Sequence, residues 1–356
     1  MSWRSVLLPA ASFAAFVAVT WPSQAHACAG CSNPNLPSVR AAKLADSKQL
    51  SVAFALSATA VNFVHSTDCP DLGPICAVRD EPPQLHDQML YTTELRPIVE
   101  FGFDDHFGVE GQLPVRLTLT TIRFRSLDGA LYSPDYENIH HRNETIAGIG
   151  DFGLSGRARW KLADADFTAR VGLTFPTGGI QPDPFELASR GLPHQHVQFG
   201  TGTFNPMASL EVSKTWGRFR LLALGQTQLF LYPNRYGYQA GNRFAGGLLG
   251  EVTFIEKLRV GVTADALNEQ GERWGGLIQS DGNIGRTDIL VGGTLAYAFK
   301  AVALGLSVKV PVYQALIKPD HTHGEEPGQL TYPAIVSLTV AMDFDFGATD
   351  EHTHPH

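Results

Sequence analysis

The most constraining feature of this sequence is a two-residue alternation of side-chain character, which is clearest between residues 146 and 175. From Phe152 to Trp160, apolar or small residues at even positions alternate with mostly polar ones at odd positions. After a turn at 164–166, the alternation resumes from Phe167 to Phe175. A period of two indicates β-strands. The same pattern recurs through most of the chain, so the sequence predicts an all-β protein.

Twelve strands are predicted, joined alternately by short and long connections. Their ranges are 50–64, 89–103, 107–124, 146–163, 166–176, 202–215, 218–232, 242–255, 257–267, 286–299, 301–313 and 331–346. The long connections are 65–88, 125–145, 177–201, 233–241, 268–285 and 314–330. Even strand number, short periplasmic turns and long outer loops are typical of outer-membrane barrels. The predicted fold class is a transmembrane, antiparallel, up-and-down β-barrel of the outer-membrane type, with about twelve strands.

One face of each predicted strand is apolar, as lipid requires. In the last strand this face runs from Tyr332 through Val336 and Leu338 to Phe344 and Phe346. A secreted soluble β-protein is the competing fold, and it should carry polar residues on these faces. Charged residues make up only 17% of the chain, and no later segment is apolar for long enough to form a membrane helix. The pattern therefore favours the barrel.

The first 27 residues have the features of a secretory signal peptide: Arg4, an apolar run over 6–19, and small residues around position 27. We expect a periplasmic N-terminal segment over 28–49, the barrel over 50–346, and a His-rich periplasmic tail over 347–356. This organisation predicts export to the bacterial outer membrane. The expected partners are outer-membrane lipid and the barrel-assembly machinery, since aromatic residues end the last strand.

Many charged side chains fall on the faces that alternation turns inward. The predicted lumen-lining residues are Glu94, Arg96, Glu100, Glu110, Arg116, Asp151, Arg157, Arg159, Arg170, Glu211, Glu251 and Asp288. They could form a ladder of ion pairs that fills a narrow barrel, or line a water-filled passage. Twelve strands lie between side-chain-filled small barrels and open porins, so both interpretations stay open.

Turn motifs around the alternating stretch suggest a family. Gly148-Ile149-Gly150-Asp151 begins one strand, the run from Gly172 to Gly178 ends the next, and 200–206 follows. This order resembles the outer-membrane barrels filed under phenol degradation by the meta-cleavage pathway, which are described as transporters. The resemblance implies a barrel that passes small, often aromatic, compounds, and it supplies no catalytic residue.

Four cysteines follow the signal peptide. Cys69 and Cys76 lie in the first long loop, where an oxidising compartment favours a disulfide. Cys28 and Cys31 fit a second, local disulfide, with a soft-metal or lipidation site as the alternatives. A haem attachment motif is excluded because Ser32 stands where it needs histidine.

All 13 histidines lie outside the predicted strands, and His65 and His86 fall in the first long loop. The candidate metal ligands are His140, His141, His194, His196, His321, His323, His352, His354 and His356. Imidazole groups beside carboxylates suit zinc, copper or nickel. Solvated polar loops without metal are the alternative interpretation.

Other classes of function are disfavoured. No complete nucleophile-elbow motif is present, and a catalytic triad would have to draw its histidine from a loop. A formal net charge of −8 argues against nucleic acid as a partner. The sequence therefore predicts a non-enzymatic channel or facilitated transporter for small solutes, with aromatic compounds and metal ions as candidate cargo. The alternative is a barrel that anchors His-rich, metal-binding outer loops.

Overall fold

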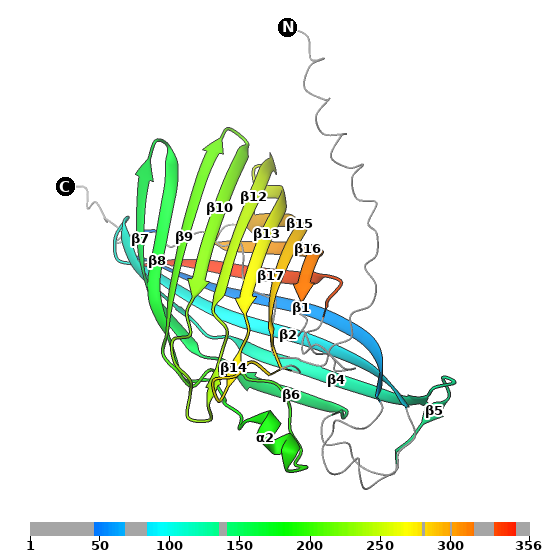
Figure 1. Cartoon of the computed structure of the whole chain (residues 1–356). Helices are drawn as coiled ribbons and strands as arrows, with labels where there is room; N and C mark the ends of the chain where they lie inside the picture. Colours follow the sequence, from blue (N-terminus) through cyan, green and yellow to red (C-terminus); the bar gives the residue numbers. More distant parts are fainter. Residues whose placement is uncertain are drawn as a thin grey trace, which may run out of the picture.

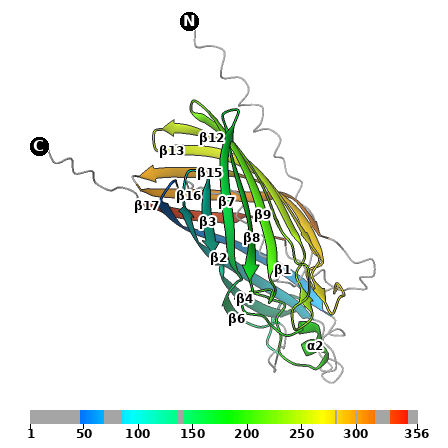
Figure 2. The same cartoon turned by 90° about the vertical axis from the view of Figure 1, so that its left-hand side faces the viewer.

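A computed structural model describes residues 46–67, 84–134, 141–279, 282–299, 301–316 and 331–346. These residues form a closed antiparallel barrel of twelve strands, which confirms the predicted fold class (Figures 1 and 2). The barrel closes because β1 pairs with β17 on one side and with β2 on the other. Within the described part of the chain, no helix is long and apolar enough to cross a membrane.

Ten barrel strands are single elements and two are each divided into a pair of shorter segments. The first four are β1 (Gln49–Thr67), β2 (Gln84–Gly102), β3 with β4 (Phe107–Gln112 and Val115–Ser126), and β6 with β7 (Glu144–Ile149 and Phe152–Leu162). The other eight are β8 (Ala165–Phe175), β9 (Asn205–Trp216), β10 (Phe219–Gln228), β12 (Arg243–Ile255), β13 (Leu258–Gln270), β15 (Gly285–Phe299), β16 (Val302–Leu316) and β17 (Ile335–Asp345). Outside the barrel wall lie β5 (Leu131–Tyr132), β11 (Tyr238–Gln239), β14 (Arg273–Trp274) and helix α2 (Pro184–Ser189).

The two ends of the barrel differ, as the loop lengths predict. Tight turns such as those after β7, β9 and β12 gather at one end, and α2 and β14 lie at the other (Figure 1). The β7–β8 turn places Ala163 and Asp164 in the left-handed region, with φ of 49° and 61°. Two successive residues with positive φ match the right-handed twist of a hairpin. We call the end with α2 the outer end and the other the periplasmic end.

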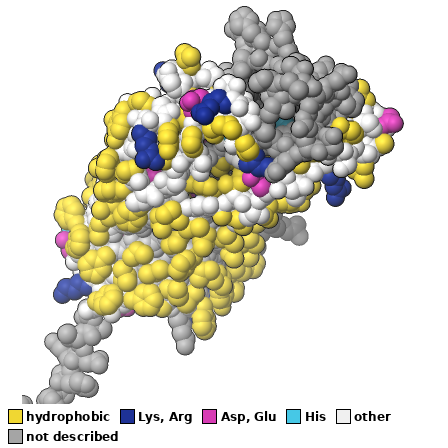
Figure 3. All heavy atoms as spheres, turned by 90° about the horizontal axis from the view of Figure 1, so that it is seen from below, with side chains coloured by type: hydrophobic (Ala, Val, Ile, Leu, Met, Phe, Trp, Pro, Cys, Tyr) yellow, Lys and Arg dark blue, Asp and Glu magenta, His cyan; other side chains and the backbone are white. Residues whose placement is uncertain are grey.

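The outer wall is apolar and the inner wall is polar. Leu154, Val171, Leu173 and Leu338 are exposed on the outside. Arg157 and Arg170, which lie opposite each other in register, are buried inside. Figure 3 shows hydrophobic side chains covering the wall on one face. Because the barrel is closed, every strand edge is hydrogen-bonded to a neighbouring strand. Its apolar exterior suits a lipid environment. The chain is thus a barrel of the bacterial outer membrane.

The wall is interrupted at one level in two neighbouring strands. The first break separates β3 from β4 at Leu113 and Pro114, since proline has no N–H to donate to the ladder. The second separates β6 from β7 at Gly150 and Asp151. The two breaks are joined by a hydrogen bond of 2.7 Å from the Gly150 N–H to the Pro114 carbonyl. Strand β2 runs past both without interruption.

Two predictions about individual residues are wrong. His65 and His86 lie in β1 and β2, opposite each other in register, and not in a loop. The backbone ladder of this hairpin continues beyond the apolar belt, which the sequence pattern does not show. Tyr332 is not on the lipid face: it is 4% exposed and precedes β17, which begins at Ile335. Pro333 cannot donate to the ladder, so Tyr332 is free to turn inward.

Candidate solute site in the barrel lumen

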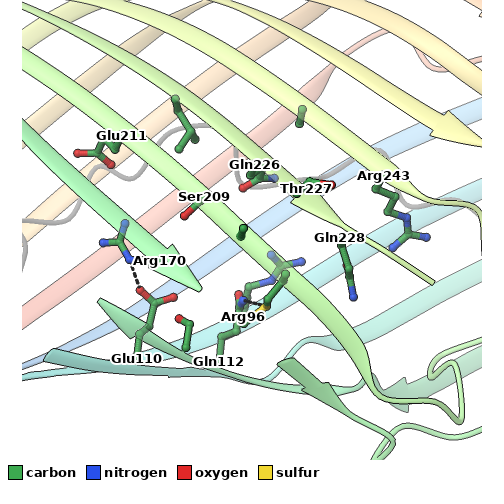
Figure 4. Close-up of a pocket in the computed structure, with 15 residues that line it drawn as sticks. Arg96, Glu110, Gln112, Arg170, Ser209, Glu211, Gln226, Thr227, Gln228 and Arg243 are labelled. Atoms are coloured by element: carbon green, nitrogen blue, oxygen red, sulfur yellow. Dashed lines mark hydrogen bonds and ion pairs between the residues drawn. The ribbon is translucent and has the colours of Figure 1, made fainter. Parts of the chain in front are cut away.

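A network of buried ion pairs occupies the periplasmic half of the lumen, between β2, β3, β7 and β8. Glu100 accepts from Arg157 Nη1 at 2.8 Å and from Arg170 Nη2 at 3.3 Å. Arg170 also contacts Glu110 through Nε at 2.8 Å (Figure 4). The four side chains are 0–6% exposed. Buried charges are tolerated when each has an opposite partner, and here two carboxylates and two guanidiniums neutralise one another.

A second group of charges lies halfway along the lumen, where the wall is interrupted. Glu94 of β2 is opposite Arg116 of β4 and accepts from its Nε at 2.8 Å. Arg96, two residues along β2, also binds Glu94 through Nη2. Arg116 additionally donates to the Phe199 carbonyl at 3.2 Å. One carboxylate is therefore shared by two guanidinium groups, which leaves a local excess of positive charge.

The remaining predicted lumen residues occupy separate positions. Arg159 contacts Asp46 near the periplasmic end at 3.4 Å. Glu251 lies between Arg220 at 3.4 Å and Arg259 at 3.5 Å. Asp288 is fully buried and binds Arg286 at 2.9 Å and the Tyr332 hydroxyl at 2.8 Å.

Asp151 has a role that alternation does not predict. Its Oδ1 accepts from the Gly178 N–H at 3.0 Å, and its Oδ2 accepts from the Thr201 N–H at 2.8 Å. It therefore ties both ends of the loop over 176–204 to the break in the wall. The loop packs closely there: a side chain at Gly200 would approach the Gly178 backbone to 2.6 Å. Phe199 packs equally closely against Gly148 on the inner wall.

Two adjoining cavities lie between the charged wall and the opposite wall of β9, β10 and β12. The inner cavity is bounded on one side by Glu110 and Arg170 and on the other by Ser209, Glu211 and Gln226 (Figure 4). The Glu211 carboxylate has neither a hydrogen bond nor an ion pair among the described residues. The outer cavity lies next to it, towards the long loops. Both cavities share five lining residues: Arg96, Gln112, Met207, Gln228 and Arg243.

Aromatic side chains from the long loops form a buried cluster at the outer end. We call Phe185, Phe230, Tyr238 and Trp274 the aromatic cap. Trp274 lies with its ring centroid 4.9 Å from that of Tyr238 and 6.4 Å from that of Phe185. Phe230, Tyr238 and Trp274 are 2–5% exposed. The two-residue alternation does not predict the cap; its only signal in the sequence is a concentration of aromatic residues in loops expected to be polar.

A buried carboxyl group lies beneath the cap. Glu272 is 3% exposed and accepts from Trp274 Nε1 and from the Asn283 N–H, both at 3.3 Å. Burial raises the pKa of Glu272 to about 7, against the two hydrogen bonds that lower it. Glu272 therefore changes its charge within the physiological pH range.

Two predicted metal ligands lie beside the cap. His194 and His196 are each 5% exposed, with ring centroids 5.4 Å apart, and His196 packs edge-on against Phe185. Burial lowers the pKa of His194, and burial together with His194 lowers the pKa of His196 to about 3. Both imidazoles are therefore neutral at pH 7.

The other metal and cysteine predictions are largely untested by the structure. His141 is buried, and among the described residues no three His, Cys, Asp or Glu side chains gather as a metal site. The remaining metal candidates lie outside the described residues: His140, His321, His323, His352, His354 and His356. Cys28, Cys31, Cys69 and Cys76 lie there as well.

Comparison with known proteins supports the fold. An outer-membrane channel from Pseudomonas putida F1 aligns over 85% of this chain and 97% of its own, with a TM-score of 0.55 and 13% identity. A FadL homologue from Pseudomonas aeruginosa aligns over 84% and 90%, with a TM-score of 0.39 and 11% identity. No family model matches the chain, so the resemblance to the phenol-degradation family stays a prediction. No curated protein matches the sequence either.

Proposed function

We propose that this barrel is an outer-membrane channel or facilitated transporter for small solutes, with aromatic compounds as the favoured class. The observation that carries the proposal is the pair of adjoining cavities inside the barrel. They lie between a wall of paired charges and a mainly polar wall that includes Ser209, Glu211 and Gln226. Internal cavities are expected in a barrel that passes solutes, whereas a barrel that serves only as an anchor does not require them.

The favoured class follows from the side chains around the outer cavity. Phe199, Phe230 and Tyr238 line it together with guanidinium and amide groups. Apolar walls with a few placed polar groups are typical of sites for small molecules. Metal ions are less well matched as cargo, because each carboxylate on the charged wall at Glu94, Glu100 and Glu110 is already paired with arginine.

Proteoliposome swelling tests the proposal. The whole chain, purified from outer membranes, is reconstituted, and the vesicles are placed in isotonic arabinose or in isotonic stachyose. The proposal expects rapid swelling in arabinose and little in the larger sugar. Vesicles that hold folded barrel and do not swell faster in arabinose than empty vesicles would overturn it.

A further inference from the structure

Arg96 differs from the other buried arginines of the lumen. Its side chain is 13% exposed, and among the described residues its only ion pair is with Glu94, a carboxylate that it shares with Arg116. The buried Arg96 Nε has no hydrogen-bond partner in the part of the chain that the structure describes. A single carboxylate cannot neutralise two guanidinium groups, so this position favours a further anion.

The position of Arg96 makes it accessible from the hollow. Arg96 lines both cavities, and Figure 4 shows it between the charged wall and Gln228. Its neighbour Pro97 lies opposite the break at Leu113, whose N–H donates to the Pro97 carbonyl at 3.1 Å. The uninterrupted strand β2 thus holds Arg96 at the level where the two cavities meet.

The charges around the hollow favour an anion. Three arginines and two carboxylates line the outer cavity: Arg96, Arg116, Arg243, Glu94 and Asp151. The oxygens of Asp151 are directed to backbone N–H groups of the loop over 176–204. Arg243 is held by Glu269 at 2.9 Å, a residue that does not line the cavity. Among the described residues, Arg96 is therefore the lining arginine with no partner besides the shared Glu94.

The apolar part of the same cavity favours a flat ring. Phe230 and Tyr238 belong to the aromatic cap, and Arg243 lies over the Phe230 ring at 5.5 Å. Met207, which the two cavities share, adds a polarizable wall. An aromatic ring and a guanidinium donor within one cavity match the two halves of an aromatic carboxylate.

We propose that Arg96 is the recognition residue of a binding site for small aromatic carboxylates, where the cavities meet. The carboxylate accepts from the Arg96 guanidinium, and the ring lies towards the aromatic cap. This proposal rests on the proposed function, because it names the solute class of the same lumen.

Binding of benzoate and of benzamide, its uncharged isostere, tests the proposal. Both are titrated calorimetrically into the whole chain in detergent, in the wild type and in Arg96→Gln. We expect the wild type to prefer benzoate by roughly tenfold or more, the range of a charge-assisted hydrogen bond, and R96Q to lose that preference. Arg259→Gln, an arginine that lines neither cavity, should keep it.

A second variant keeps the test decisive if R96Q does not fold. Gln228→Glu adds a carboxylate to the shared lining and leaves the Arg96–Glu94 pair intact. It should abolish the preference for benzoate by repulsion. The proposal is overturned if the wild type binds both probes equally, or if folded R96Q or Q228E retains the preference. Arabinose swelling is measured on the same samples: unchanged swelling in R96Q with unchanged benzoate binding would defeat the anion site and leave the channel standing.

Discussion

The charged network of the lumen and the aromatic cap are built in opposite ways. The network of Glu100, Arg157, Arg170 and Glu110 lies on four barrel strands that are locked in register. The cap is assembled from loop segments between strands, and its rings contact one another where no barrel ladder supports them. The difference indicates that the network contributes to the free energy of unfolding of the barrel itself. We therefore expect the cap to unfold locally at a lower free energy than the barrel.

Removing Glu100 should have the largest effect. Glu100→Gln leaves Arg157 and Arg170 buried with a weakened partner, which should cost roughly 3–5 kcal/mol of unfolding free energy. This loss of unfolding free energy is measured by urea unfolding of the reconstituted barrel, with the heat-modifiable gel shift as the readout of the folded fraction. Glu256→Gln, at an exposed periplasmic turn, is the control and should change nothing. Equal unfolding midpoints for both variants would refute the structural role of the network.

Removing Trp274 should affect the cap and spare the barrel. Trp274→Ala leaves a cavity against Tyr238 and Phe185, with a local cost of about 3 kcal/mol. Limited proteolysis should cut the long loops much faster, while the urea midpoint of the barrel stays within error of the wild type. A barrel midpoint that falls as far as it does in E100Q would show that the cap and the barrel unfold as one unit.

The cap should also respond to pH through Glu272. Its pKa of about 7 lies above the usual 4.5, so the folded cap binds the proton more tightly than the unfolded chain. The resulting stability is fully present below about pH 4.5 and is lost as the pH rises through about 7. Hydrogen exchange at the Trp274 indole should therefore quicken between about pH 5 and pH 8, after correction for intrinsic rates. Glu272→Gln should remove this dependence, and a profile identical to the wild type would exclude Glu272 as its source.

The smallest effect is expected where the loop over 176–204 meets the wall. Asp151→Asn keeps the shape, but its single amide oxygen can accept only one of the two backbone hydrogen bonds, at a cost of about 1–2 kcal/mol. Amide exchange at Gly178 and Thr201 should accelerate accordingly. Asp128→Asn, in the exposed loop after β4, leaves these two amides unchanged. Equal protection in D151N and the wild type would mean that the loop is held by packing alone.

The sequence predicts the network far better than it predicts the cap. The inward position of Arg157 and Arg170 follows from the two-residue period, because a strand between lipid and lumen has only two faces. The register that brings both to Glu100 depends on the pairing of four strands, which alternation does not specify. Cap residues such as Phe185 and Trp274 come from loops far apart in sequence, so only the folded structure brings them together. Asp151 keeps the predicted position but binds a loop that no local pattern connects to it.

Single-channel conductance across a planar bilayer tests the central claim most directly. Two neighbouring residues of β9 provide a matched pair: Ser209 lines the inner cavity, whereas Leu210 is 45% exposed on the lipid face. We expect stable conductance steps from the wild type and from Leu210→Trp, and loss of most of the conductance in Ser209→Trp, because the indole fills the cavity. Folded S209W that conducts as well as the wild type, or a wild type that conducts no current, would contradict a solute path through this lumen.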